Sequence, residues 1–256
     1  MRWRRLCSWA ISVAIAPVIL YGCAPHPVTF DTTTATGSIT GQPGWRGLVI
    51  AAPHGTSDPR TGDIAAALAR RTGFGVVIAT GFGLEPDARE RAGRRYEVNR
   101  PFEGVPGRPL AEEVATDGAR LVYEAYERRV REVAQGPLRF LAEVHGNNHR
   151  DAAGRIEIAT VGVDRDEAFR LRVLLEVIRD AHLRANRGAP RLEILVEPAD
   201  TLRYAASGAK KNGILRLLER GLHIELPRAA RAEWREAYTA ILADFLVQAA
   251  ALAAGR

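Results

Sequence analysis

Three apolar segments of this 256-residue chain each lead to side chains that could bind a metal ion or move a proton. His54 and then Asp58 follow GLVIAA, His145 follows LRFLAEV, and Glu225 lies within LHIEL. In open α/β sheets, ligands bind beyond the carboxyl ends of the strands, so we expect these side chains to converge at one edge of a sheet. Two imidazoles and one carboxylate are enough to hold a catalytic zinc ion, with one position left for water.

The chemistry that this set predicts is metal-assisted hydrolysis. Zinc would lower the pKa of its bound water to about 7, which makes hydroxide available at neutral pH. Glu225, if it is not a ligand, would accept the proton of the attacking water and return it to the leaving group. Glu143 lies two residues before His145 on the same strand face and could orient that imidazole. His223 shares a strand face with Glu225 and could line the same pocket.

The identity of the acidic ligand is open at this level. Asp58 lies four residues after His54, a spacing that is common by chance. Asp63 is an alternative ligand, although its place in the first turn of a predicted helix would also stabilise the helix dipole. A stronger indication is that His54 and His145 each precede a glycine, which lets the backbone turn tightly past an ion.

Four motifs resemble the N-formylglutamate amidohydrolase family: APHGTSDPRTGDIAAALA, VNRPFEG, EVHGN and HIELPR, in that order. They are also similar to motifs of phage poly-γ-glutamate hydrolases and, more distantly, of zinc carboxypeptidases and aspartoacylase. The resemblance covers most of residues 46–228 and implies a carboxypeptidase-like mixed sheet with one zinc ion. It implies His54 and His145 as zinc ligands, with Asp58 or Asp63 as the acidic one. It also implies Glu225 as the general base and acid.

The same resemblance extends to substrate binding. Asn99 and Arg100 in VNRPFEG would match an Asn-Arg pair that holds a substrate carboxylate. A guanidinium can bind a carboxylate through two parallel hydrogen bonds. The enzymes of this family are usually cytoplasmic, whereas this chain is expected to be exported, because residues 1–22 have the features of a signal peptide. The expected reaction is therefore hydrolysis of amide bonds in N-acyl amino acids or acidic peptides, without a specific substrate.

The pattern of the remaining elements predicts an α/β fold. Apolar segments alternate with amphipathic ones, which indicates a sheet covered by helices on both faces, and the resemblance implies a three-layer mixed sheet. Residues 81–109 are predicted to form a long loop. Strands are predicted at 47–52, 75–80, 138–144, 155–161, 192–197 and 222–226. Helices are predicted at 63–71, 110–134, 164–185 and 208–219, with another at the C-terminus.

Residues 1–22 have the features of a bacterial signal peptide. A positive segment, 1–9, precedes an apolar segment, 10–21, that is too short to span a bilayer. The sequence Leu20-Tyr21-Gly22-Cys23 resembles a lipoprotein signal, in which Cys23 becomes the acylated first residue. Plain secretion and an uncleaved anchor are alternatives. Residues 23–45, rich in Thr, Pro and Gly, are predicted to be a flexible tether, which leaves 46–256 as a single catalytic domain.

Composition argues against nucleic acid as a partner. The net charge is +6, but half of it belongs to Arg2, Arg4 and Arg5 in the predicted signal. No stripe of basic residues with interleaved aromatics is present in the sequence. The expected partners are a small-molecule or peptide substrate bearing a carboxylate, and a membrane reached through the lipid anchor of Cys23. The alternative function is a non-catalytic envelope lipoprotein that binds a carboxylate ligand. A metal-dependent phosphoesterase would usually need two close metal ions and more ligands.

Overall fold

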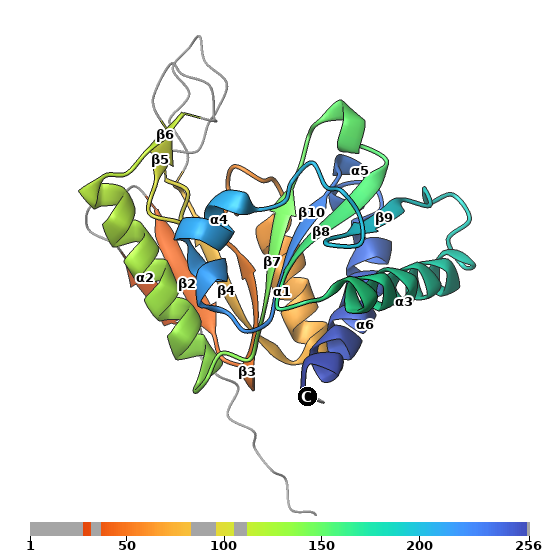
Figure 1. The fold of residues 1–256 in the computed structure, drawn as a ribbon, viewed down its shortest axis with the longest axis horizontal. Helices are drawn as coiled ribbons and strands as arrows, with labels where there is room; N and C mark the ends of the chain where they lie inside the picture. The colour runs from red at the N-terminus through yellow and green to blue at the C-terminus, as the bar shows by residue number, and fades with distance from the viewer. Residues whose placement is uncertain (1–27, 32–36, 83–95, 105–111, 255–256) are drawn as a thin grey trace, which may run out of the picture.

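The computed structural model describes residues 28–31, 37–82, 96–104 and 112–254, which form a mixed sheet of eight strands between two layers of helices (Figure 1). The strand order is β1-β2-β4-β3-β7-β10-β8-β9. The four central strands β4, β3, β7 and β10 are parallel, and β2 and β8 run antiparallel to them at either side. The predicted α/β fold with a mixed sheet and helices on both faces is therefore confirmed.

The strands of the large sheet are β1 (Val28–Asp31), β2 (Ser38–Gln42), β3 (Trp45–Ala52), β4 (Phe74–Thr80), β7 (Phe140–Gly146), β8 (Arg155–Val161), β9 (Glu193–Val196) and β10 (Gly221–Leu226). A separate pair is formed by β5 (Glu103–Gly104) and β6 (Glu113–Val114). The helices are α1 (Thr61–Thr72), α2 (Asp117–Ala134), η1 (Arg150–Ala152), α3 (Arg165–Leu183), α4 (Ser207–Asn212), η2 (Ile214–Leu217), α5 (Arg228–Arg231) and α6 (Arg235–Ala254).

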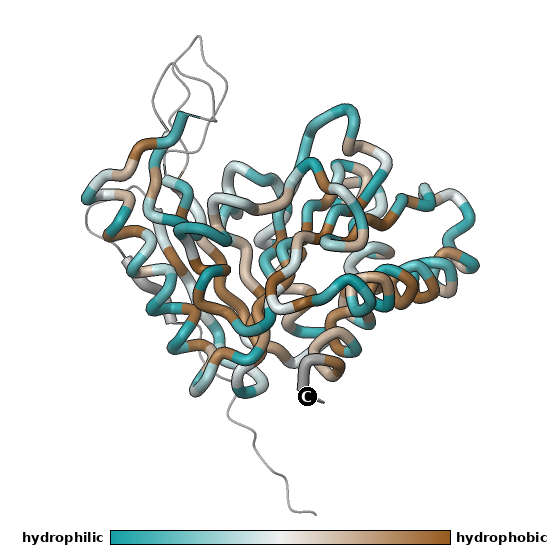
Figure 2. The backbone as a smooth tube through the Cα atoms, in the orientation of Figure 1, coloured by the Kyte–Doolittle hydropathy of each residue, from teal (hydrophilic) through white to brown (hydrophobic). Residues whose placement is uncertain are grey.

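Two apolar layers hold the sheet. One lies between the sheet and α1, α3 and α6, and the other lies between the sheet and α2, α4 and η2. Hydrophobic residues are concentrated where the strands and the inner faces of the helices meet (Figure 2). Strands β7 and β10 are buried along nearly their whole length, as expected when helices cover both faces of a parallel sheet. These paired, buried strands position the residues at the ends of β3, β7 and β10.

The prediction that residues 23–45 form a flexible tether is wrong for most of the residues in this range that the structure describes, because they form strands. Strand β2 pairs antiparallel with β4, and β1 pairs with β2, so the sheet extends into this segment. Ile39 is fully buried, and Gly41 packs so closely on α2 that a Cβ there would lie 2.5 Å from Cδ of Arg129. The segment pairs through its backbone and buries small or isolated apolar residues, which composition alone does not reveal. The predicted signal peptide and Cys23 lie outside the described residues.

Two of the helices also differ from the prediction, one in where it begins and the other in being divided. Helix α2 begins at Asp117 rather than at 110, because Thr116 is extended and its side chain accepts a hydrogen bond from the Ala119 amide. The helix predicted over 208–219 is divided at Gly213 into α4 and η2. A Cβ at Gly213 would lie 2.1 Å from the Asn99 carbonyl oxygen, so the close approach of that loop requires a glycine. Among the described helices, none has both the length and the apolar content needed to cross a membrane.

Candidate metal centre

The predicted site residues converge at the carboxyl ends of three neighbouring parallel strands. His54 lies two residues beyond the end of β3, His145 lies in the last part of β7, and Glu225 lies near the end of β10. Glu225 and His145 are directly paired across the β7–β10 ladder. Parallel strands end at the same edge of a sheet, so His145 and Glu225, 80 positions apart in sequence, become neighbours.

The side chains of His54, Asp58 and His145 form a compact triangle of ligand atoms. The Nδ1 atoms of the two histidines are 3.1 Å apart, and Oδ2 of Asp58 lies 3.4 Å from His54 Nδ1 and 3.6 Å from His145 Nδ1. All three residues are buried. Zinc bonds of about 2.0–2.2 Å at tetrahedral angles would separate ligand atoms by about 3.3–3.6 Å. The two distances to Asp58 fall within this range and the distance between the histidines is slightly shorter, so the triangle is close to the size of a single zinc site.

The remaining ring nitrogens indicate that this triangle needs a cation. His54 Nε2 lies 3.0 Å from the Glu97 carbonyl oxygen, which can only accept a hydrogen bond, so Nε2 carries the proton. His145 Nε2 faces Oε2 of Glu143 at 3.5 Å. With a proton on each Nε2, both Nδ1 lone pairs would be directed toward each other and toward a carboxylate. Such electron-pair donors stay together only around a proton or a metal ion.

The charges around His145 also favour a cation at this position. Burial lowers the pKa of His145, but hydrogen bonds to Asp58 and Glu143, together with the charges of Glu143 and Glu225, more than reverse this effect and raise the pKa from 6.5 to about 9. Burial raises the pKa of Glu225, whereas the hydrogen bond to His223 and the charges of His223 and His145 bring it below its ordinary value. The cluster thus stabilises positive charge at His145 and ionised carboxylates around it.

Asp63 is not part of the cluster. Its side chain is 63% exposed on α1, where Oδ2 lies 3.7 Å from Arg60 and 3.3 Å from Arg235. Asp58 instead reaches inward, and its Oδ2 accepts a hydrogen bond from the Gly146 amide at 3.2 Å. Of the two acids that the sequence left open, the structure brings only Asp58 to the histidines.

Glu143 occupies the position behind His145 that the sequence suggested. It is fully buried and accepts hydrogen bonds from the Tyr126 hydroxyl at 2.8 Å and from the Asn99 amide at 3.1 Å. Its Oε2 also lies 3.5 Å from both His145 Nε2 and His223 Nδ1. Glu143, His145 and His223 are close enough to hold a metal ion themselves. Because Glu143 already has two donors, we assign it to orienting the imidazoles.

Glu225 lies beside the ligand triangle without belonging to it. His223 connects them: its ring stacks on His145 at a centroid distance of 3.8 Å, and its Nε2 lies 3.1 Å from Glu225 Oε1. Glu225 is 7% exposed and its carboxylate contacts His223, so it is held in place with little access to solvent. This arrangement suits a proton acceptor next to a metal ion.

The contacts of Asn99 and Arg100 differ from those expected of a substrate clamp. Asn99 is fully buried and its amide donates to Glu143, so it supports the histidines from behind. The Arg100 guanidinium donates from Nε to Glu113 at 2.9 Å, and its Nη2 contacts Glu113 and lies 3.0 Å from Glu97. Glu97 and Glu113 were not recognised from the sequence. The carboxylate-binding role of Arg100 stays a prediction, and it would require Arg100 to exchange a protein carboxylate for a substrate one.

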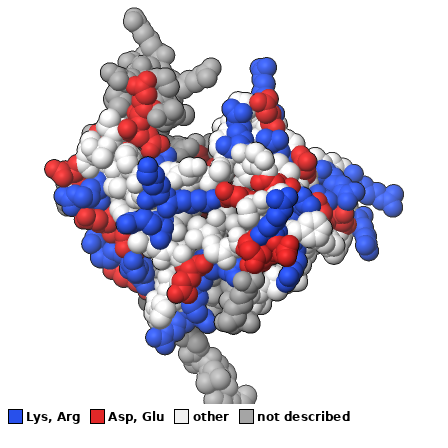
Figure 3. All heavy atoms as spheres, viewed as in Figure 1, with Lys and Arg blue, Asp and Glu red and all other residues white. Residues whose placement is uncertain are grey.

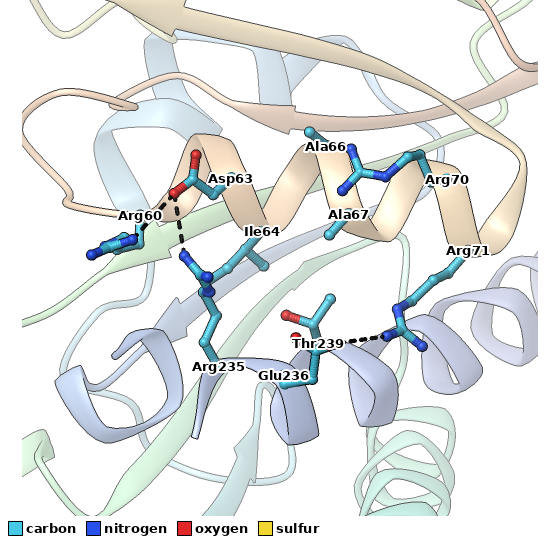
Figure 4. A pocket seen from close by; sticks show the side chains of 10 residues that line it. All are labelled: Arg60, Asp63, Ile64, Ala66, Ala67, Arg70, Arg71, Arg235, Glu236 and Thr239. Atoms are coloured by element: carbon cyan, nitrogen blue, oxygen red, sulfur yellow. Dashed lines mark hydrogen bonds and ion pairs between the residues drawn. The ribbon is translucent and has the colours of Figure 1, made fainter. Parts of the chain in front are cut away.

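A separate cavity of about 520 Å³ lies between α1 and α6 (Figure 4). It is lined mainly by charged residues, including Asp63, and none of His54, Asp58 and His145 contributes to it. Arg71 contacts Glu236, and both Arg60 and Arg235 contact Asp63, so most of these charges are paired. Charges of both signs are likewise interspersed on the molecular face shown in Figure 3.

Comparisons with known proteins identify similar solved structures but no family. No protein-family model and no curated protein matches the sequence. A bacteriophage poly-γ-glutamate hydrolase is 13% identical, with a TM-score of 0.48 over 88% of this chain and 93% of that chain. A metallo-carboxypeptidase from Burkholderia cenocepacia is 12% identical, with a TM-score of 0.43 over 91% and 66%. Murine aminoacylase 3 is 16% identical, with a TM-score of 0.35 over 84% and 67%. At these similarities, membership of the N-formylglutamate amidohydrolase family stays a prediction.

Proposed function

We propose that this protein is a zinc-dependent hydrolase of amide bonds, with His54, Asp58 and His145 as the metal ligands. The observation that carries this proposal is the buried triangle of two Nδ1 atoms and one carboxylate oxygen, with edges of 3.1, 3.4 and 3.6 Å. Three protein ligands with one open position are typical of catalytic rather than structural zinc. When bound, zinc supplies a Lewis acid that polarises a carbonyl group and makes water more acidic.

The neighbouring residues supply the proton chemistry. Glu225 accepts the proton of the attacking water and returns it to the leaving amine, a role that needs an ionised carboxylate. The lowered pKa of Glu225 provides that state at neutral pH. His223 holds Glu225 through the 3.1 Å contact, while Glu143 faces Nε2 of His145 and so leaves its Nδ1 directed at the metal position.

The proposed substrates are N-acyl amino acids or acidic peptides in the cell envelope. The VNRPFEG motif supports a substrate carboxylate, and the predicted signal peptide with Cys23 supports an exported, lipid-anchored enzyme. The test is hydrolysis by the full chain, loaded with zinc, of a panel of N-formyl and N-acetyl amino acids and glutamyl peptides. Release of amine from acidic members of the panel, abolished by a chelator, is expected. Saturable binding of these compounds without turnover would instead favour the binding lipoprotein.

Glu143→Gln is expected to weaken zinc binding by about 10- to 100-fold, the usual effect of changing a residue that orients a metal ligand. The amide of Gln cannot match the charge of a carboxylate that faces two imidazoles. Competition with a chromophoric chelator measures the affinity. Glu193→Gln is the matched control, because Glu193 is exposed on β9. Equal affinity in wild type and Glu143→Gln would contradict the role of Glu143.

Zinc is expected to stabilise the folded protein. At a free concentration 100 times its dissociation constant, a ligand that binds only the folded state adds about 2.7 kcal/mol. For a chain of this size, that energy corresponds to a rise of about 5–10 °C in the unfolding temperature. Thermal unfolding with zinc and with excess chelator measures this difference. His54→Ala should show the same unfolding temperature in both conditions, and a zinc-dependent rise in that variant would argue against His54 as a ligand.

A further inference from the structure

Arg231 is a buried cation at the end of α5, and no catalytic or metal-binding motif includes it. Its side chain is enclosed, with 3% of the residue exposed. Nε donates to the Leu226 carbonyl oxygen at 3.0 Å, and Nη1 donates to the Pro59 carbonyl oxygen at 2.8 Å. Nη2 donates to the Asn147 carbonyl oxygen at 3.0 Å and to Oδ1 of Asn148 at 2.9 Å. Each guanidinium nitrogen therefore has a partner.

The acceptors of Arg231 share one property. Pro59 directly follows Asp58, Leu226 directly follows Glu225, and Asn147 lies two residues after His145. One side chain thus binds the backbone of three separate segments, each of which carries a metal ligand or the proposed general base. A planar guanidinium can donate in several fixed directions at once, which a lysine ammonium on a flexible stem does not reproduce.

Gly146 makes room for this guanidinium. A Cβ at residue 146 would lie 2.6 Å from Cζ and 2.7 Å from Nε of Arg231. Gly146 is not among the residues with a positive φ, so its backbone conformation is open to alanine, and the three atoms nearest to an added Cβ all belong to Arg231. Gly146 therefore has a second role, beyond the tight turn expected from the sequence: its lack of a side chain leaves the space that the Arg231 guanidinium occupies.

The charge of Arg231 is also directed at the site. Within the described part of the chain, its nitrogens contact carbonyl oxygens and no carboxylate. Burial lowers the pKa of the guanidinium, and the charges of Asp58 and Glu225 oppose this shift. An arginine held by neutral acceptors therefore places its positive charge near two carboxylates of the centre without occupying either of them.

We propose that Arg231 is a positioning residue that sets the relative placement of the segments bearing Asp58, His145 and Glu225 before a metal ion binds. The metal-binding part of this inference rests on the proposed function, whereas the placement of the segments does not. Arg231 links them through the backbone, so its loss should loosen 57–60 and 146–148 together although they are far apart in sequence.

The experiment compares the full chain with Arg231→Met, Arg231→Lys, Gly146→Ala and the control Arg228→Met. Arg228 lies on the same short helix but is exposed. Amide hydrogen exchange of the metal-free proteins, followed by mass spectrometry, reports the mobility of 57–60 and 146–148. Chelator competition reports zinc affinity. Gly146→Ala retains the arginine but displaces it, which provides a second route to the same effect if Arg231→Met does not fold.

We expect at least tenfold faster exchange of both segments and a 10- to 100-fold loss of zinc affinity in Arg231→Met and Gly146→Ala. Arg228→Met should behave as wild type, and Arg231→Lys should restore little. Unchanged exchange of the two segments, an equal effect of Arg228→Met, or full restoration by Arg231→Lys would each overturn the inference. If wild type binds no zinc, the proposed function fails, and the exchange data alone then decide the role of Arg231.

Discussion

Replacing His145 with alanine is expected to remove zinc from the protein. Elemental analysis of the full chain should find about one zinc ion per wild-type chain and none in His145→Ala. In the proposed site His145 would supply one of three protein ligand atoms, and its Nδ1 lies 3.1 and 3.6 Å from the other two. Loss of a direct ligand should lower the affinity more than 100-fold, beyond the 10- to 100-fold typical of residues that only orient a ligand.

The matched control for this prediction is His182→Ala. His182 lies on α3, where its Nε2 is 2.7 Å from Asp244 and its imidazole belongs to no cluster of candidate ligands in the described chain. It should retain the zinc content of wild type. Retention of zinc by His145→Ala would remove His145 from the ligand set. Absence of zinc from wild type, even after reconstitution, would contradict the hydrolase mechanism and favour the binding lipoprotein.

Glu225→Gln is expected to abolish turnover while leaving the metal in place. General acid–base catalysis by a positioned side chain contributes about 10²- to 10⁴-fold, so kcat should fall by that factor on any substrate of the panel. Gln has nearly the shape of Glu and can keep the contact with His223, so the ligand triangle should persist. Rates measured on the zinc-loaded protein, together with zinc content, separate the loss of the base from the loss of the metal.

This variant also distinguishes the two functions that the sequence left open. A binding protein has no use for a proton acceptor, so Glu225→Gln should then bind the same ligands with unchanged affinity. A hydrolase should keep binding its substrate while losing turnover. Activity within tenfold of wild type, at equal zinc content, would exclude Glu225 as the general base.

Prediction from the sequence was least accurate for the N-terminal strands and for the contacts of Arg100 in the VNRPFEG motif. The segment with Ile39 and Gly41 reads as a tether because it holds few apolar residues, yet its backbone completes the sheet. Arg100 was expected to be available to a substrate, but it contacts Glu97 and Glu113. The strand pairing of this segment and the ion pairs of Arg100 both depend on which other segments of the chain lie next to them. A local sequence pattern does not predict that.

By itself, the sequence determined the α/β class, the central strands, and the histidines and carboxylate placed where those strands end. These are local properties, since an apolar run followed by a polar turn is visible within a few residues. Only the tertiary structure brought Asp58 rather than Asp63 to the histidines, placed Glu143 and Asn99 next to them, and brought Arg231 into contact with the segments that carry the site. Those relations arise when parallel strands align their carboxyl ends, because neighbours across a sheet are set by packing and strand order rather than by spacing along the chain.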